Sequence, residues 1–122
     1  MRFTQEPSSG INVIRAYGGG ELRINDATYR GAVIISASTA QSEPHIQNLD
    51  ELIAIDLSRV LALEPELVLL GTGVHQIFPA ASFGRQFLRA GIGFEVMDTG
   101  AACRTFNVLV GEKRRVVGLL LV

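Results

Sequence analysis

The chain has 122 residues and a mass of 13.2 kDa, which is the size of one domain spanning residues 1–122. Hydrophobic residues make up 48% and charged residues 19% of the chain, a composition that excludes an intrinsically disordered protein. The formal net charge is −1, from 11 basic and 12 acidic residues, and no long block of either sign occurs. This balance lacks the basic surface that duplex DNA or an anionic membrane attracts, so we expect no nucleic-acid partner.

The cellular setting is predicted from apolar runs and from cysteine usage. The longest apolar run, residues 116–122, is far shorter than the roughly 20 residues that span a bilayer, and residues 1–7 contain no apolar leader core. A single cysteine, Cys103, suits a reducing compartment. We therefore expect a cytoplasmic protein without membrane insertion. Two histidines, His45 and His75, and one cysteine give no metal-binding spacing, so we expect no metal and no cofactor.

The first part of the chain has the pattern of β-structure. Apolar residues alternate with polar ones on both sides of the glycines at 18–20, which can adopt the positive φ angles of a tight turn, so a β-hairpin is predicted. The apolar run 32–35 is typical of a strand buried on both faces. Residues 36–48 are polar and predict a loop.

The next segments combine helical spacing with buried strands. Apolar residues three and four positions apart predict at least one amphipathic helix between residues 50 and 63, ended by Pro65. The runs 67–70 and 94–97 predict buried strands, and residues 116–122 predict the last strand.

Two further helices are predicted between these strands. One begins at Pro79 and ends at Gly91, where a glycine favours the left-handed conformation of a helix C-terminus. The other is capped by Asp98 or Thr99 and extends to about Leu109. The C-terminal half is therefore expected to have the order β-α-β-α-β.

The connections predict how the strands pair. Strands joined by a helix are normally parallel, so 67–70 and 94–97 should be parallel neighbours or near neighbours. The link from 109 to 116 is too short for another helical crossover, so we expect the last strand to be antiparallel. The predicted fold class is α/β with a mixed central sheet, an N-terminal β-hairpin and a β-α-β-α-β half.

Candidate functional residues follow the carboxyl ends of the predicted strands, where helix N-termini present unpaired backbone N–H groups. The two loops run from 71 to 79 and from 97 to 104, and both border one crevice if their strands are close in the sheet. The candidate binding residues are Gly71, Thr72, Gly73, His75, Asp98, Thr99, Cys103, Arg104 and Asn107.

The glycines and the capping residues also have structural interpretations. Gly71 and Gly73 resemble the start of a phosphate-binding loop, but neither a complete GxGxxG nor a GxxxxGK motif follows, so a tight turn is the alternative. Asp98 and Thr99 are residue types that cap helices without any ligand. His75 could act as an acid–base group in the first loop.

Cys103 and Arg104 each have both a chemical and a structural interpretation. Cys103 lies in a predicted first helical turn beside Arg104 and could be nucleophilic, but no base partner is identifiable, so a packed inert thiol is the alternative. Arg104 could bind a carboxylate or another anion, or it could form an ion pair with Asp98 or Glu95.

Two motifs resemble a known family. The glycines around Thr72 with Pro79 downstream, and above all the segment EVMDTGAACRTFNVL at 95–109, resemble a family of small proteins of undefined function. That family includes bacterial and archaeal uncharacterised proteins, the human adipogenesis-associated domain protein and a mitochondrial complex I assembly factor. Weaker agreement from Tyr17 to Ile35 extends the resemblance over nearly the whole chain. It implies a three-layer β/α fold with a mixed central sheet.

The resemblance supplies no reaction. The family often has tyrosine where this chain has Phe106, which argues against a mechanism that needs a phenol there. The family's mixed sheet favours a central position for the last strand, and hence a monomer, with weak homodimerisation as the alternative.

Two functions from different classes are therefore carried forward. The first is a non-enzymatic accessory or assembly-type protein that binds a protein partner, because no nucleophile–base–orienter set, metal spacing or complete phosphate loop is present. The second is a protein that binds a small anionic ligand, or a low-turnover enzyme, with a site built from Thr72, His75, Asp98, Thr99 and Arg104.

Overall fold

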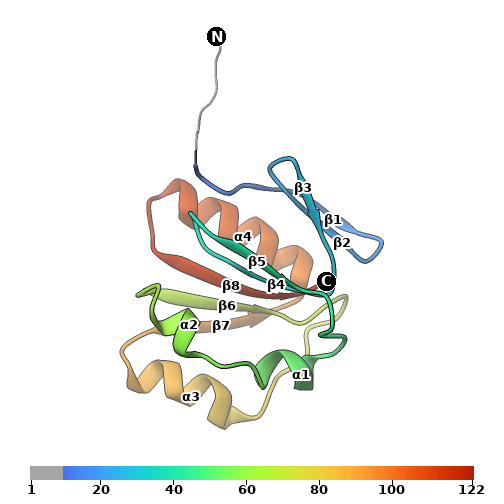
Figure 1. Cartoon of the computed structure of the whole chain (residues 1–122). Coiled ribbons are helices and arrows are strands. Elements are labelled where there is room, and N and C mark those ends of the chain that lie inside the picture. Colours follow the sequence, from blue (N-terminus) through green and yellow to red (C-terminus); the bar gives the residue numbers. More distant parts are fainter. Residues whose placement is uncertain (1–9) are drawn as a thin grey trace.

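The computed structural model describes residues 10–122, which form three layers around a central five-stranded sheet (Figure 1). One face of this sheet carries one long helix and a three-stranded sheet, and the other face carries three shorter helices. The three-layer α/β prediction with a mixed central sheet is confirmed. The elements in chain order are β1 (Ile14–Gly18), β2 (Glu21–Ile24), β3 (Ala27–Tyr29), β4 (Ala32–Ile35), β5 (Ala40–Glu43), α1 (Leu49–Ile53), α2 (Ser58–Leu61), β6 (Leu67–Gly71), α3 (Ala81–Arg89), β7 (Gly93–Met97), α4 (Thr99–Gly111) and β8 (Val116–Leu121).

The central sheet has the strand order β5-β4-β8-β6-β7. The predicted parallel pairing of β6 with β7 is confirmed, and β8 is the central strand. The expectation that the last strand is antiparallel was only half right, because β8 is antiparallel to β4 but parallel to β6. The reason is that α4 itself is the crossover: it carries the chain from β7 past β6 to β8, and no further helix is needed.

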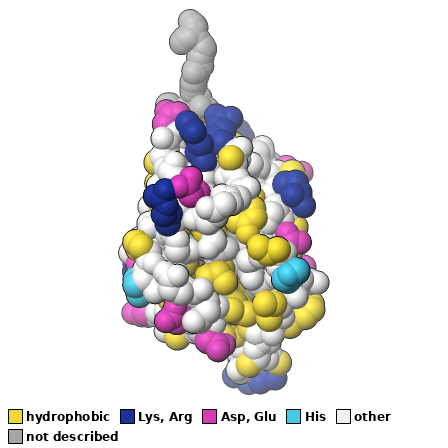
Figure 2. Space-filling view, turned by 90° about the vertical axis from the view of Figure 1, so that its right-hand side faces the viewer, with side chains coloured by type: hydrophobic (Ala, Val, Ile, Leu, Met, Phe, Trp, Pro, Cys, Tyr) yellow, Lys and Arg dark blue, Asp and Glu magenta, His cyan; other side chains and the backbone are white. Residues whose placement is uncertain are grey.

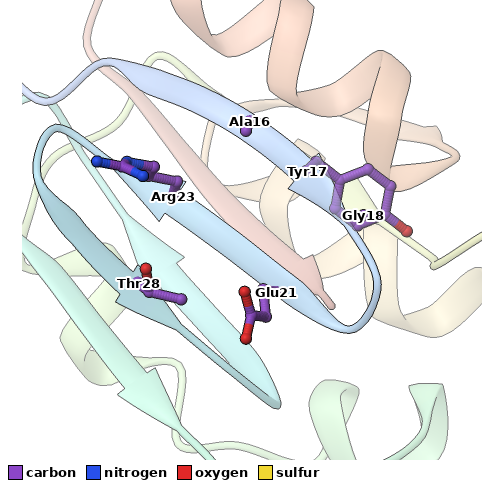
Figure 3. Close-up of a pocket in the computed structure, with 6 residues that line it drawn as sticks. All are labelled: Ala16, Tyr17, Gly18, Glu21, Arg23 and Thr28. Atoms are coloured by element: carbon purple, nitrogen blue, oxygen red, sulfur yellow. The ribbon is translucent and has the colours of Figure 1, made fainter.

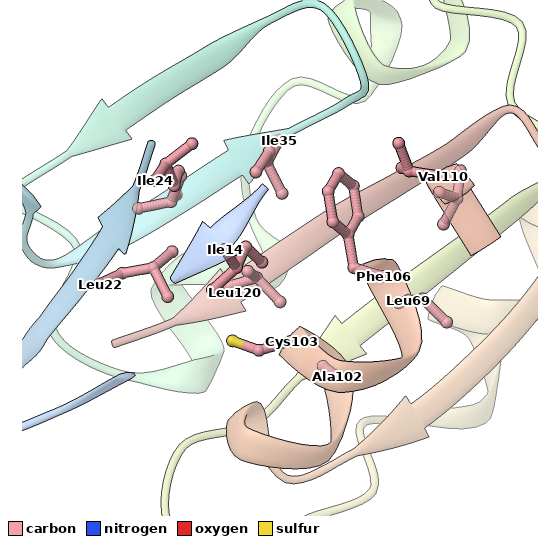
Figure 4. Close-up of a cluster of buried hydrophobic side chains, with 12 residues drawn as sticks. Ile14, Leu22, Ile24, Ile35, Leu69, Ala102, Cys103, Phe106, Val110 and Leu120 are labelled. Carbon is pink, nitrogen blue, oxygen red and sulfur yellow. The ribbon is translucent and has the colours of Figure 1, made fainter. Parts of the chain in front are cut away.

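The two faces of the central sheet are packed by alternating side chains of the same strands. On one face, Leu69 of β6 and Leu120 of β8 contact α4 and the three-stranded sheet, with Phe106 of α4 fully buried between the layers (Figure 4). On the other face, Leu70 and Leu119 contact α1, α2 and α3. Strands buried on both faces read as continuous apolar runs, which is why β4, β6 and β8 were recognisable from sequence.

Residues 36–48 were predicted to be a loop, but they contain β5. This strand has the polar sequence AQSE and lies at the edge of the sheet, paired antiparallel with β4. Its sequence does not alternate between apolar and polar residues. Its extended conformation comes from backbone pairing with β4. Polar sequences are common in edge strands, where they discourage pairing with other chains.

The helix predicted between residues 50 and 63 is divided into α1 and α2. Asn48 caps α1 by accepting a hydrogen bond from the Glu51 backbone N–H, and Asp56 accepts one from the Ser58 N–H just before α2. The predicted start of the third helix at Pro79 was two residues early, because α3 begins at Ala81.

The helix ends follow the sequence signals more closely. Gly91, predicted to end α3, has a φ angle of +77°, and the N–H of the following Ile92 bonds to the Phe87 carbonyl. Helix α4 continues to Gly111, two residues beyond the predicted end at Leu109.

The predicted N-terminal hairpin is formed by β1 and β2, and β3 extends it to a three-stranded sheet. Gly19 and Gly20 have φ angles of +61° and +77°, the conformation that a two-residue hairpin turn requires. This sheet is tied to α4 by Asn107, whose side-chain amide accepts from the Ile14 N–H and donates to the Ile14 carbonyl, both at 2.9 Å.

Candidate functional site

The two loops named from the sequence lie side by side at the carboxyl ends of β6 and β7. The Thr99 N–H donates to the Gly73 carbonyl at 2.9 Å, and the Thr72 N–H donates to the Met97 carbonyl at 3.0 Å. The predicted proximity of β6 and β7 thus brings the GTG segment and the first turn of α4 into direct contact.

Thr99 is the centre of this contact. Its side chain is fully buried, and its hydroxyl accepts from the Gly73 N–H at 2.8 Å while donating to the Leu121 carbonyl at 2.7 Å. A Cβ atom on Gly71 would lie only 3.0 Å from the Thr99 hydroxyl oxygen. The absence of a side chain at Gly71 therefore makes room for the Thr99 side chain. One side chain therefore joins the loop after β6, the start of α4 and the end of β8.

Thr72 fixes the shape of the loop that follows β6. Its side chain is 3% exposed, and its hydroxyl donates to the His75 carbonyl at 2.6 Å and accepts from the Ile77 N–H at 3.0 Å. The side chain of His75 is exposed, and only its backbone carbonyl takes part in this arrangement. Thr72 therefore acts on the conformation of residues 72–77, with both functions of its hydroxyl already engaged.

Asp98 is the N-cap of α4. The sequence predicted that either Asp98 or Thr99 would be the cap. Its carboxylate accepts a hydrogen bond from the Ala101 N–H at 2.8 Å, which occupies a donor at the helix N-terminus that an anion would need.

Cys103 is buried on the inner face of α4 and belongs to the core between α4 and the three-stranded sheet (Figure 4). Burial raises the pKa of its thiol to about 11, because the thiolate loses its hydration there; the neighbouring Arg104 lowers this pKa and Asp98 raises it, both to a smaller extent. A thiol with such a pKa is almost entirely protonated near neutral pH, which matches the packed, inert alternative.

Arg104 is exposed, and it forms no salt bridge with Asp98 or Glu95 in the part of the chain that the structure describes. It borders a hollow of about 200 Å³ between β1 and α4, together with Tyr17, Cys103 and Asn107. The candidates therefore fall into two groups. Gly71, Thr72, Gly73, Asp98 and Thr99 form the contact between the loops, Cys103, Arg104 and Asn107 line the hollow, and His75 stands apart from both.

A second shallow hollow, of about 250 Å³, lies on the three-stranded sheet (Figure 3). It is lined by Tyr17, Glu21, Arg23 and Thr28, which project from β1, β2 and β3, and Glu21 also forms a salt bridge with Arg30. The charged groups have opposite signs and are solvent-exposed or half-buried, so this surface has no strong preference for an anion or a cation.

A groove of about 640 Å³ lies between α3 and β7 and is larger than the two hollows; no sequence pattern indicated it. Its lining includes the exposed side chains of Phe78 and Leu88, the backbone of Gly84, and Phe94 and Val96 of β7. Gly84 allows α3 to approach β7 closely, because a Cβ atom there would meet the Phe94 ring at 2.6 Å. A side chain at position 84 would therefore push α3 away from Phe94 and change the shape of the groove.

The loop before α3 adds apolar side chains next to this groove. Val74 is 80% exposed, Phe78 71% and Ile77 50%, and Leu88 of α3 is 62% exposed. Figure 2 shows hydrophobic side chains gathered on the face of the molecule that holds the ends of β6 and β7. We call these four residues the apolar patch. The one signal in the sequence was a loop with several large apolar residues that no helical or strand period explains.

Two absences complete the description of residues 10–122. Within this range no group of three or more His, Cys, Asp and Glu side chains is placed to hold a metal ion. None of the helices described is long and apolar enough to cross a membrane.

The chain matches, over residues 14–121, the model of a family described as "Protein of unknown function (DUF498/DUF598)". It therefore belongs to this family, as the motif at 95–109 indicated. It is 30% identical over 117 residues to the "13 kDa major membrane protein" of Francisella tularensis subsp. holarctica, covering 95% of each chain. It is 31% identical over 123 residues to "NADH dehydrogenase [ubiquinone] 1 alpha subcomplex assembly factor 3" of Danio rerio, covering 99% of this chain and 70% of the relative.

A crystal structure of a Bordetella parapertussis protein has the same fold. It superimposes with a TM-score of 0.82 at 33% sequence identity, covering 94% of this chain and 98% of the other. The fold is thus shared across the family, and none of these descriptions states a reaction.

Replacing Thr99 tests the contact between the loops. Thr99→Val keeps the shape of the side chain but leaves the Gly73 N–H and the Leu121 carbonyl without partners, so we expect the free energy of unfolding to fall by about 2–4 kcal/mol. Thr99→Ser keeps the hydroxyl and should lose about 1 kcal/mol. Urea unfolding followed by circular dichroism measures both, and a loss for Thr99→Ser as large as that for Thr99→Val would contradict the dominant contribution of the hydroxyl.

The reactivity of Cys103 tests its environment. Because burial raises the pKa of the Cys103 thiol from its ordinary value of 9.0 to about 11, the folded protein should carry about 100-fold less thiolate at pH 8 than the unfolded chain. Iodoacetamide should therefore modify the native protein at least about 100-fold more slowly than the protein in urea, as measured by mass spectrometry. Similar rates in the two states would contradict the packed thiol and return Cys103 to the list of nucleophiles.

Proposed function

We propose that this protein is a non-enzymatic accessory protein that binds a protein partner through the apolar patch and the groove between α3 and β7. The observation that carries the proposal is the exposure of Val74, Ile77 and Phe78 in one short loop, together with that of Leu88, which lines the same groove as Phe78. Large exposed apolar groups that lie together are typical of protein-binding surfaces, and aromatic residues contribute most to their affinity.

The distribution of polar groups supports binding over catalysis. The hydroxyls of Thr72 and Thr99 and the carboxylate of Asp98 are engaged in internal hydrogen bonds, and burial keeps Cys103 protonated. The Danio rerio relative is described as an assembly factor, and an assembly role is the class of activity that an apolar binding surface serves. We place the protein in the cytoplasm, as a monomer before it meets its partner.

Phe78→Ser tests this proposal. Because Phe78 is 71% exposed, the change should leave stability within about 0.5 kcal/mol, while recovery of a partner from the host's lysate should fall about tenfold or more. The matched control is Val108→Ser, which removes an apolar group that is 59% exposed from α4 on the opposite face of the sheet. Quantitative mass spectrometry of affinity-captured material gives the readout. Recovery of no partner by the wild-type protein, or equal recovery by all three proteins, contradicts the proposal.

Binding of a small anionic ligand is the second candidate. The guanidinium of Arg104, which forms no salt bridge among residues 10–122 and borders its hollow, favours it. The hollow of about 200 Å³ is smaller than most ligand pockets, which suits an ion or a small carboxylate at most. A ligand that binds only the folded state raises the melting temperature, so phosphate or citrate at millimolar concentration should stabilise the wild-type protein and not Arg104→Ala. A flat response of the wild-type protein removes this candidate.

A further inference from the structure

β7 is an edge strand of the central sheet with one side free. Among the described residues, only β6 pairs with it, through the parallel register Leu67↔Gly93 to Gly71↔Met97. The opposite edge strand, β5, is polar and is followed by Pro44, which blunts it against further pairing. β7 has the sequence GFEVM and lacks a proline, so the two edges differ in their capacity to accept another strand.

The hydrogen-bonding groups on the free side of β7 belong to Phe94 and Val96. The Gly93 N–H donates to the carbonyl of Glu66, just before β6, and the Met97 carbonyl accepts from the N–H of Thr72, just after β6. Backbone groups alternate in direction along a strand. Those of Phe94 and Val96 therefore point away from β6. The Val96 carbonyl accepts from the side-chain amide of Gln76 at 3.0 Å, as it would from the N–H of an added strand.

The side chains of β7 differ in polarity between the two faces of the sheet. Phe94 and Val96 face α3 and line the groove, whose outer wall includes the exposed side chain of Leu88. Glu95 points toward the opposite face of the sheet, is exposed, and forms no salt bridge in the described part of the chain. An added strand would thus meet a mainly apolar groove, whose lining also includes Gln76 and Arg85, on one side and the Glu95 carboxylate on the other.

This pattern disfavours a second copy of the chain as the added strand. Two β7 strands related by a two-fold axis overlap most when the axis passes through Glu95, and the two carboxylates then lie directly opposite each other. Like charges at opposite positions of antiparallel strands are destabilising, whereas opposite charges there attract. The complementary strand therefore carries a cation at this position.

We propose that an extended segment of a protein partner adds to β7 as a sixth strand, with apolar side chains in the α3 groove and a lysine or arginine opposite Glu95. Strand addition to a free sheet edge is a general mode of peptide recognition, in which backbone bonds give affinity and alternate side chains give specificity. The inference rests on the proposed function and defines how the partner binds. In the bound state, the N–H and carbonyl of Phe94 and the N–H of Val96 gain partners, and Gln76 either stays as the last donor or is displaced.

A pair of synthetic peptides tests the inference on the full chain. The probe has about nine residues that alternate threonine and valine, with a central lysine, and its control has glutamate in place of the lysine. In ¹H–¹⁵N NMR titrations, the lysine peptide should shift the amide signals of Phe94 and Val96 and the side-chain amide of Gln76. Its Kd should be about fivefold lower than that of the glutamate peptide, the factor expected from a cross-strand charge pair.

A charge reversal provides the matched variant. Glu95→Lys changes an exposed side chain and should invert the preference, so that the glutamate peptide binds more tightly than the lysine peptide. Signals of Gln41 on the opposite edge strand should not move. The inference is overturned if neither peptide shifts β7 at millimolar concentration, if both bind equally, or if the shifts map to β5. It is also overturned if light scattering gives a dimer of about 26 kDa, twice the chain mass, that Glu95→Lys alters, because the occupant is then a second copy.

These outcomes are separable from the test of the proposed function. If capture from the lysate depends on Phe78 but the peptides do not bind β7, the partner uses the apolar patch in another way and only the strand addition fails. If the peptides bind β7 as expected but no partner is captured, the edge accepts a strand while the accessory role fails.

Discussion

The fold depends on the buried hydroxyl of Thr99. Three chain segments that are distant in sequence meet at this one group: the loop after β6, the first turn of α4 and the end of β8. The contact favours a glycine at position 71, because a Cβ atom there would lie only 3.0 Å from the Thr99 hydroxyl oxygen and would push the two segments apart. A buried hydroxyl whose donor and acceptor are both used stabilises one arrangement of its neighbours and penalises others, since each would leave a polar group unpaired. Around this point the central strand β8 is held in register with the two loops.

The sequence predicted those elements whose cause is local. Glycines encode the hairpin turn, Asp98 marks the N-terminus of α4, and Gly91 marks the end of α3. Continuous apolar runs in the sequence mark the buried strands. The misses have a different cause, because they depend on partners far away in the chain. β5 is a strand because its backbone forms hydrogen bonds with β4. β8 is parallel to β6 because α4 is long enough to carry the chain across that strand.

The same distinction explains the candidate site. Residue type and position after a strand correctly placed Gly71, Thr72, Gly73, Asp98 and Thr99 together, but these rules say nothing about whether their polar groups are free. In the folded chain each has a partner within the protein, which a single sequence does not reveal. The groove between α3 and β7 escaped notice for the opposite reason. It is built mainly from apolar residues and one helical glycine, with Gln76, Arg85 and Glu95 scattered among them, and this mixture matches no motif of a binding site.

The internal hydrogen bonds and the exposed apolar patch are linked by one short loop. Thr72 holds residues 72–77 through two hydrogen bonds, and the loop then presents Ile77 and Phe78 to solvent immediately before α3 begins. A loop that is already ordered loses little conformational entropy on binding, so more of the contact energy of its side chains appears as affinity. In the proposed function, the buried threonines support partner binding without touching the partner, because they keep the apolar side chains in place beside the edge of β7. Thr72, Asp98 and Thr99 thus form internal hydrogen bonds, and the apolar surface that we propose for partner binding lies next to them.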